Sequence, residues 1–223
     1  MALFGRGRRG ADGNGDAARL RRRLADYAPY VPPHPGDPRD LDADAARANL
    51  AHFERVRDTR LAGLAALLAD WDIRLPDTSG AADAESVVNA LHDWSGRAWP
   101  GLGASAPVPW RGGGRTGADI PFSLAFDVAT LLGEIVRRHR PRWRWAVDTT
   151  PAHGTEEVET FNRIVLRAPF APDPARTVEL DLERVVVERL IHPGHAEQRH
   201  DRPWWRAVST ALSGGYEGDV PLL

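Results

Sequence analysis

Apolar residues recur every three or four positions in three long stretches of the chain. The stretch 42–72 begins with acidic residues, which cap free amides and suit the helix dipole, so it predicts a long helix. A second helix is predicted over 82–96. The stretch 120–139 is apolar around most of its circumference and stops before Pro141, which predicts a helix buried on more than one side.

Directly after this helix, the spacing of apolar residues changes from every third or fourth position to every second position. Trp143, Trp145 and Val147 alternate with polar residues, and this alternation predicts a strand. A second strand over 160–168 is expected to pair antiparallel with the first, and a third is expected around 178–182. Helices that precede a small sheet predict an α+β fold, with N-terminal helices followed by a small antiparallel β-meander packed on the buried helix.

The end of the chain adds two predicted helices. The segment 183–191 carries apolar residues that fit both a helix and a strand, and we favour a helix. A final helix is expected with Asp201 as its cap and Pro203 in its first turn, because proline suits the first turn of a helix. Its expected end is the glycine pair Gly214-Gly215.

The N-terminal part differs from the rest in composition. It starts with a Gly-rich basic stretch, and residues 16–28 can form a short basic helix. Four prolines between residues 32 and 38 forbid regular helix and strand pairing there. We therefore expect a basic flexible arm and a Pro-rich linker over 1–38, followed by a single α+β domain over 39–223. Deleting residues 1–23 should then leave stability unchanged.

Composition excludes several kinds of chemistry. The chain has no cysteine and no lysine, which excludes thiol nucleophiles, Cys-containing metal sites, Schiff bases and a Walker lysine. Residues 1–23 hold seven arginines against two aspartates, a balance of +5, so the remainder of this −2 chain carries −7. Only residues 1–23 therefore suit nucleic acid or an acidic membrane surface. Short N-terminal apolar runs resemble no secretory signal, and we expect a cytoplasmic protein.

A histidine-rich segment is the first candidate site. His192, His195 and His200 lie within nine residues of one another, together with Glu197. Imidazoles and a carboxylate at this density can hold zinc or nickel, or serve a hydrolase with or without a metal. The spacing does not match a helical metal motif, and an ordinary polar loop explains it equally simply. We expect no cofactor.

The second candidate is Glu134, a carboxylate within the apolar helix. A buried carboxylate needs a partner, and Arg142 or Arg144 on the following strand is the natural one. The pair either fixes the helix against the sheet or anchors a polar ligand inside a groove with aromatic walls. Gly133, beside it, permits a close approach of helix and strand.

Eight tryptophans are many for this length, and they divide into two groups. One group lies near loops or helix starts, where its members are either anchors for a partner or ordinary packing residues: Trp99, Trp110, Trp204 and Trp205. The Gly-rich segment 111–117 lacks the end of a phosphate-binding motif, so we expect a surface loop there. Four further tryptophans lie on apolar faces and are expected in the core: Trp71, Trp94, Trp143 and Trp145.

One part of the sequence resembles known proteins. The run Ser123–Glu134, followed by Arg142 to Trp145, resembles small uncharacterised α+β proteins of a high-GC, actinobacterial type. In these, a buried helix with Gly-Glu precedes a strand that contains tryptophan. The segment 61–71 is similar to such proteins as well, and some of them are immunity or accessory proteins of polymorphic toxins. The resemblance implies an α+β binding domain without known catalytic residues.

Three functions follow from these patterns. The first is a non-catalytic protein-interaction or ligand-binding domain, regulatory or immunity-like, with an unidentified protein as its partner. The second is a hydrolase that uses the histidine-rich segment. The third is a membrane-surface or nucleic-acid adaptor that acts through residues 1–23. The sequence contains no nucleophile elbow and no dinucleotide fingerprint, which favours the first.

Overall fold

A computed structural model describes most of the chain. The described residues are 11–75, 81–102, 115–150, 153–154, 159–192 and 201–218. Within them the chain forms six α-helices and three β-strands. These are α1 (Ala11–Leu24), α2 (Ala43–Leu68), α3 (Ala81–Ala98), α4 (Ile120–His139), β1 (Arg144–Val147), β2 (Ile164–Phe170), β3 (Asp173–Leu180), α6 (Leu182–Ile191) and α8 (Pro203–Leu212).

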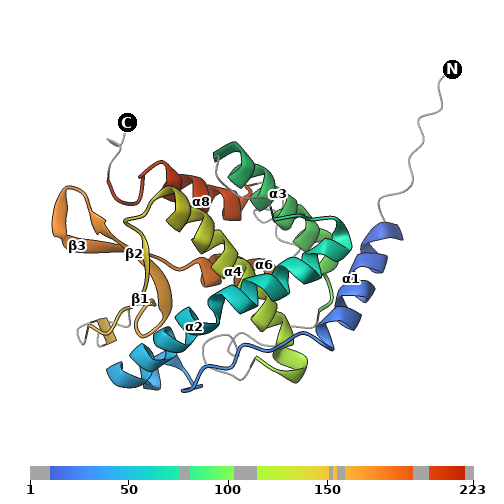
Figure 1. The fold of residues 1–223 in the computed structure, drawn as a ribbon, viewed down its shortest axis with the longest axis horizontal. Helices are drawn as coiled ribbons and strands as arrows, with labels where there is room; N and C mark the ends of the chain where they lie inside the picture. Colours follow the sequence, from blue (N-terminus) through green and yellow to red (C-terminus); the bar gives the residue numbers. More distant parts are fainter. Residues whose placement is uncertain are drawn as a thin grey trace.

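The predicted α+β fold is confirmed. Four helices precede a three-stranded antiparallel meander in the order β1-β2-β3 (Figure 1). Trp145 lies opposite Leu166, and Leu166 lies opposite Leu180, so these three side chains share one face of the sheet. That face carries the apolar residues that join the core.

Helix α4 is the central element, as its apolar pattern predicts. Every residue from Pro121 to Gly133 is buried, and α4 contacts α2, α3, α6 and α8 (Figure 1). The meander reaches α4 through Trp145, whose indole lies against Gly133. Although α4 is the most apolar helix, no helix within the described residues has the length and apolar character needed to cross a membrane.

Two of the helix starts follow local capping rules. Asp42 caps α2 by accepting from the Ala45 amide, and Asp181 caps α6 by accepting from the Arg184 amide. The cap predicted for Asp201 is wrong, because Arg202 precedes Pro203 in a left-handed conformation and its side chain makes no cap. The Arg202 guanidinium instead binds Asp93 of α3 at 2.7 Å, which orients the start of α8.

The described part of the expected flexible arm packs on the body of the protein. Helix α1 lies against α3, and Leu20 and Leu24 are buried in the main core. The arginines of α1 are also engaged: Arg21 donates to the Gly101 carbonyl, and Arg23 pairs with Asp70. The apolar positions of this short basic helix bury enough surface to hold it in place, so the flexible-arm prediction is wrong for this helix. Residues 1–10 lie outside the described residues.

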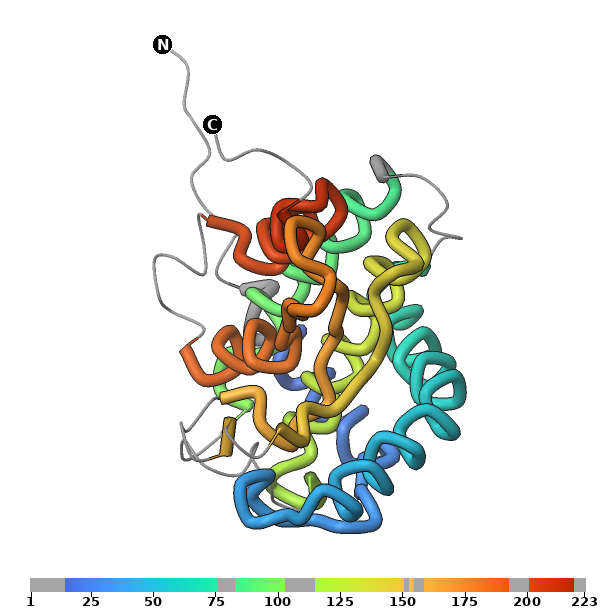
Figure 2. Tube along the Cα trace, turned by 90° about the vertical axis from the view of Figure 1, so that its left-hand side faces the viewer, coloured from blue at the N-terminus to red at the C-terminus, as the bar shows by residue number. Residues whose placement is uncertain are grey.

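Residues 25–42, which we call the strap, connect α1 to α2 along one end of the molecule (Figure 2). The strap has no regular helix over most of its length, as its prolines predict, but it is tied to its surroundings. The Tyr30 amide donates to Ser123 Oγ at 2.8 Å. The amide and the carbonyl of His34 both bind the side chain of Asn49. The predicted linker is therefore a docked segment of the fold.

Candidate functional site

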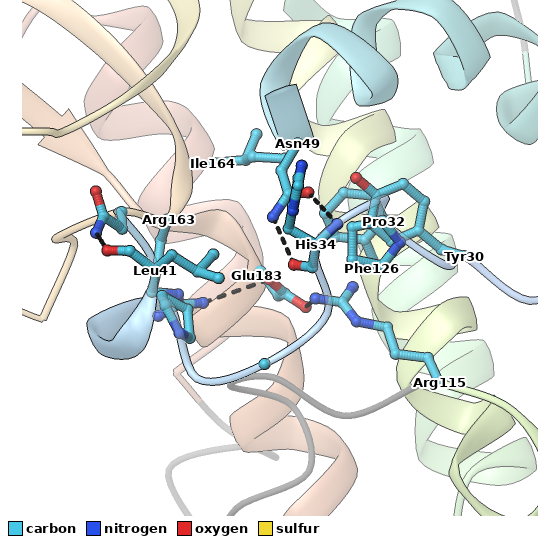
Figure 3. Close-up of a pocket in the computed structure, with 13 residues that line it drawn as sticks. Tyr30, Pro32, His34, Leu41, Asn49, Arg115, Phe126, Arg163, Ile164 and Glu183 are labelled. Carbon is cyan, nitrogen blue, oxygen red and sulfur yellow. Dashed lines mark hydrogen bonds and ion pairs between the residues drawn. The ribbon is translucent and has the colours of Figure 1, made fainter. Parts of the chain in front are cut away.

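A small pocket lies where the strap crosses the body of the protein, and we call it the Tyr30 pocket (Figure 3). Its volume is about 60 Å³. Residues from the strap, α2, the segment before α4, α4 itself, the start of β2 with the two residues before it, and α6 converge on the pocket, although they are far apart in sequence. The lining residues are Tyr30, Pro32, His34, Gly36, Pro38, Leu41, Asn49, Arg115, Phe126, Asn162, Arg163, Ile164 and Glu183.

One wall of the pocket is aromatic. Tyr30 stacks on Phe126 with ring centroids 4.3 Å apart. The guanidinium of Arg115 lies 4.5 Å from the centroid of Phe126 and 5.3 Å from that of Tyr30, within the range of cation–π attraction. Burial raises the pKa of Tyr30, so its hydroxyl stays protonated and remains able to donate.

The opposite side of the pocket is a chain of alternating charges. Arg115 Nη2 lies 2.8 Å from Glu183 Oε1, and Arg163 Nη2 lies 3.4 Å from Glu183 Oε2. Arg163 also pairs closely with Asp181, whose pKa is raised by burial against the opposing effect of Arg163. All four side chains are at least 88 % buried, since their exposed fractions are 12 % or less. The formal charges of the two arginines and the two carboxylates sum to zero.

Several buried polar atoms of the pocket residues have no hydrogen-bond partner among the described residues. They include Tyr30 Oη, Arg115 Nη1, Asn162 Oδ1 and Glu183 Oε1, the last of which touches Arg115 only as an ion pair. Folded proteins satisfy the great majority of buried polar atoms, so such a concentration needs an explanation. These atoms are also sealed from solvent, so a group that enters the pocket does not reach them.

The carboxamides of two asparagines hold the rim of the pocket. Asn49 accepts from the His34 amide at 3.0 Å and donates to the His34 carbonyl at 2.9 Å. Asn162, which adopts a left-handed backbone conformation, donates to the Leu41 carbonyl at 2.8 Å. The strap is thereby fixed on both sides of the pocket.

A second buried polar cluster ties the strap to α4. Arg60 of α2 donates to both oxygens of Asp127 at 2.6 Å, and the Tyr27 hydroxyl donates to Asp127 Oδ2 at 2.5 Å. Burial, and secondarily the charge of Asp127, raises the pKa of Tyr27, so the phenol stays a donor. Arg60 also donates to the Ala28 carbonyl. This cluster is internally paired and has a structural role.

The predicted partners of Glu134 are wrong. Glu134 accepts from Trp145 Nε1 and Arg137 Nη1 at 2.7 and 2.8 Å, and Arg57 of α2 lies 3.5 Å away. Strand alternation explains the error, because Trp145 points toward α4 and its neighbour Arg144 therefore points away. Arg142 is exposed before the strand begins. Glu134 does not line the Tyr30 pocket. The prediction that Gly133 admits a close helix–strand approach is confirmed.

The tryptophan candidates differ in how far the structure buries them. Trp204 is fully buried, with ring centroids 5.5 Å from Trp99 and 5.3 Å from His92, so it is a core residue and offers no exposed anchor. Trp205, next to it, is half-buried against the core. Trp110 and residues 111–114 of the Gly-rich segment lie outside the described residues.

The histidine candidates are mostly beyond what the structure describes. His192 is exposed at the end of α6, 4.0 Å from Glu188. His195 and His200 lie outside the described residues. Within the described ranges, no group of three or more His, Asp or Glu side chains is arranged to hold a metal ion. The metal and hydrolase predictions therefore stay predictions.

Sequence reasoning missed the Tyr30 pocket because its residues come from separate segments. One local signal was available for the neighbouring cluster, because Asp127 is a carboxylate within the most apolar helix and must have a partner. Comparison of the chain with models of protein families, with curated protein sequences and with solved structures finds no match. Function is therefore inferred from the site itself.

Proposed function

We propose that the chain is a non-catalytic protein-interaction module that binds its partner at the Tyr30 pocket. The observation that carries this proposal is the pocket itself, where separate segments bring a wall of stacked aromatic rings beside paired charges. A regulatory or immunity-like role, which the resemblance of residues 123–145 implies, is one form that such binding takes.

The charges around the pocket favour recognition over catalysis. Each lining carboxylate or guanidinium described above is already held by an opposite charge, and the pairs are buried. A general acid or base must exchange a proton with a substrate, which requires a group free to change its charge. A balanced network of fixed pairs instead offers a rigid surface with a defined pattern of donors and acceptors.

The size of the pocket favours a protein partner over a metabolite. The volume of the pocket is about 60 Å³. Small-molecule sites usually occupy roughly 300–1,000 Å³. The pocket therefore suits the end of one side chain, which a partner protein inserts while its surface rests on the strap.

The arginines of α1 weigh against the adaptor alternative. Arg19 lies over the Trp71 ring, Arg21 binds the Gly101 carbonyl and Arg23 pairs with Asp70. Cations that are committed to contacts within the protein are less available to phosphates. Arg6, Arg8 and Arg9 belong to residues outside the described part of the chain.

A crosslinking experiment in the native host tests the proposal. A photoreactive amino acid at His34, on the exposed rim of the pocket, should capture a partner that the same group at Arg176 on β3 does not capture. Capture at His34 should fall sharply in a Tyr30→Phe background, which keeps the stacked ring and removes the hydroxyl. Capture that is equal at both positions, or unchanged by Tyr30→Phe and by Arg115→Met, would refute binding at this pocket.

A further inference from the structure

The outer face of the strap indicates what kind of partner the protein takes. We infer that residues 28–32 are a preformed polyproline II ligand for a partner domain whose groove is lined by aromatic side chains. This inference rests on the proposed function, since it needs a protein partner, and it adds the kind of surface that this partner presents.

The local sequence sets the backbone conformation of this part of the strap. Residues 28–33 read Ala-Pro-Tyr-Val-Pro-Pro. Each proline fixes its own φ at about −65° and drives the residue before it out of the helical region. Only Tyr30 is not set in this way, and its amide donates to Ser123 Oγ at 2.8 Å. Residues 27–32 accordingly lie outside helices, strands and turns, as a polyproline II segment does.

Two tyrosines hold one edge of the segment against the body of the protein. A polyproline II helix has three residues per turn, so Tyr27 and Tyr30 lie on the same edge. The Tyr27 hydroxyl donates to Asp127, and the Tyr30 ring stacks on Phe126 (Figure 3). Because both tyrosines point inward, the two remaining edges of the segment face outward.

The outward edges are apolar. Ala28, Pro29 and Val31 are exposed, and Pro32 is half-buried beside the Tyr30 pocket. Val31 is 45 % exposed, and it is the one large apolar side chain that is exposed among the residues that the structure describes. The dipeptides Ala28-Pro29 and Val31-Pro32 are one turn apart, which is about 9 Å along a polyproline II helix. They therefore form two similar apolar ridges.

Aromatic side chains complement such a surface. Their flat rings pack on proline and valine, and the indole N–H or phenol hydroxyl donates to backbone carbonyls, which make no hydrogen bonds within a polyproline II segment. Grooves that take proline-rich segments are built in this way. Strand addition is a poorer fit, because two of the five residues 28–32 are prolines and have no N–H to donate.

The fold holds this ligand in place before a partner binds. Arg60 Nη2 donates to the Ala28 carbonyl at 3.0 Å, and Asn49 binds both the amide and the carbonyl of His34. Ordering a mobile segment on binding costs affinity, which a segment already fixed on both sides avoids. The intact chain should therefore bind more tightly than the same sequence in a free peptide.

Purified SH3 and WW domains, which take proline-rich segments, test the inference on the intact wild-type chain. Each domain is titrated with the chain while the NMR signals of the aromatic side chains in its groove are followed. At least one domain should bind through its groove with a Kd below about 1 mM. A synthetic peptide of residues 26–34 should bind the same domain more weakly. No binding by any domain, binding away from the groove, or a peptide that binds as tightly as the chain would overturn the inference.

Three variants locate the ligand within the strap. Pro29→Ala and Val31→Ser each remove part of one ridge and should weaken binding of the domain at least roughly tenfold. Pro35→Ala is the matched control, because Pro35 is exposed but follows residues 28–32, and it should leave the affinity unchanged. Circular dichroism checks folding, and one folded variant of the first pair is sufficient. Equal losses for the two proline variants, or no loss in Val31→Ser, would contradict the assignment.

The domain titrations and the crosslinking experiment fail separately. Domain binding without any partner captured at His34 supports the strap as a ligand and refutes the function proposed for the Tyr30 pocket. Capture at His34 that is unchanged by Pro29→Ala and Val31→Ser supports that function and refutes the strap as a ligand. Capture that is lost in either variant supports both.

Discussion

The indole of Trp145 occupies the space that a side chain on Gly133 would fill. A Cβ atom at Gly133 would lie 2.3 Å from Trp145 Cζ2 and 2.5 Å from Cη2. The same indole donates to Glu134 at 2.7 Å and meets the ring of Phe53 edge-on at a centroid distance of 4.9 Å. These contacts set the distance between the meander and α4.

Gly133→Ala should therefore destabilise the protein. The indole must shift to admit the methyl group, and overpacking of this kind costs about 1–3 kcal/mol in free energy of unfolding. Urea denaturation measures the loss. The matched control is Gly63→Ala in α2, where nothing lies within 4 Å of the added Cβ. That change should stabilise the protein by roughly 0.5–1 kcal/mol, because alanine suits a helix interior better than glycine. Equal stability of the two variants would contradict the close contact.

Leu20→Ala should show that α1 belongs to the fold. Leu20 is fully buried in the main core, so its truncation should cost about 2–5 kcal/mol in free energy of unfolding. The exposed neighbour Arg22 is the control, and Arg22→Ala should change stability by no more than about 0.5 kcal/mol. Deletion of residues 1–23 should likewise lower the melting temperature, contrary to the expectation from composition. An unchanged melting temperature would show that α1 does not pack as described.

Asp127→Asn should be among the most damaging single changes. The substitution leaves the largely buried guanidinium of Arg60 without its charge partner, which typically costs about 3–5 kcal/mol. Asp58→Asn is a fair comparison, because Asp58 also pairs with an arginine but is well exposed, and exposed pairs contribute little. Thermal unfolding measures the loss of stability in each variant. Similar small losses for the two would contradict a buried ion pair at Asp127.

Asp148 should contribute stability that disappears in acid. Burial alone would raise its pKa, but hydrogen bonds from His153 and Thr150 outweigh burial and lower it from the ordinary value. A carboxylate whose folded pKa is lowered stabilises the protein fully above the unfolded pKa of about 3.9 and loses this effect as pH falls through the folded pKa. The stability difference between wild type and Asp148→Asn should therefore shrink below about pH 4.

The measurement is the melting temperature of wild type and Asp148→Asn between neutral and acidic pH. The exposed Glu54 supplies a control, since Glu54→Gln should leave the shape of the acid profile unchanged. A difference between wild type and Asp148→Asn that stays constant with pH would mean that Asp148 does not titrate in this range.

Two neighbouring tryptophans should respond differently to truncation. Trp204 is fully buried among aromatic rings, so Trp204→Ala should cost about 3–5 kcal/mol. Trp205 is only half-buried, and Trp205→Ala should cost clearly less. Chemical denaturation of the two variants compares the losses, and a larger loss for Trp205 would contradict the packing of α8.

Local structure was largely predictable because the spacing of apolar residues indicates whether a segment forms a helix or a strand. The predicted range 120–139 coincides with α4, and the antiparallel pairing of the first two strands is confirmed. The choice of a helix over 183–191 is also correct, since α6 spans Leu182–Ile191. Each of these depends on contacts or spacings within one short segment.

The candidate site was not predictable, because it depends on pairs that are distant in sequence. Asn162 and Leu41, which meet at the pocket, are 121 positions apart, and each looks ordinary in its own segment. The prolines of the strap correctly excluded helix and strand, yet they do not reveal that Asn49 holds His34 in place. Residue types alone cannot say which arginine reaches which carboxylate, because several candidates of each kind compete.

The docking of α1 has a consequence for synthesis on the ribosome. Arg21 binds the carbonyl of a residue 80 positions later, and Tyr27 binds a residue 100 positions later. An isolated helix of 14 residues is marginal in water, so α1 gains lasting structure only after α3 and α4 have left the exit tunnel. Helix α1 is therefore translated before the elements it packs on but settles after them, and its leucines are accessible to chaperones in the interval.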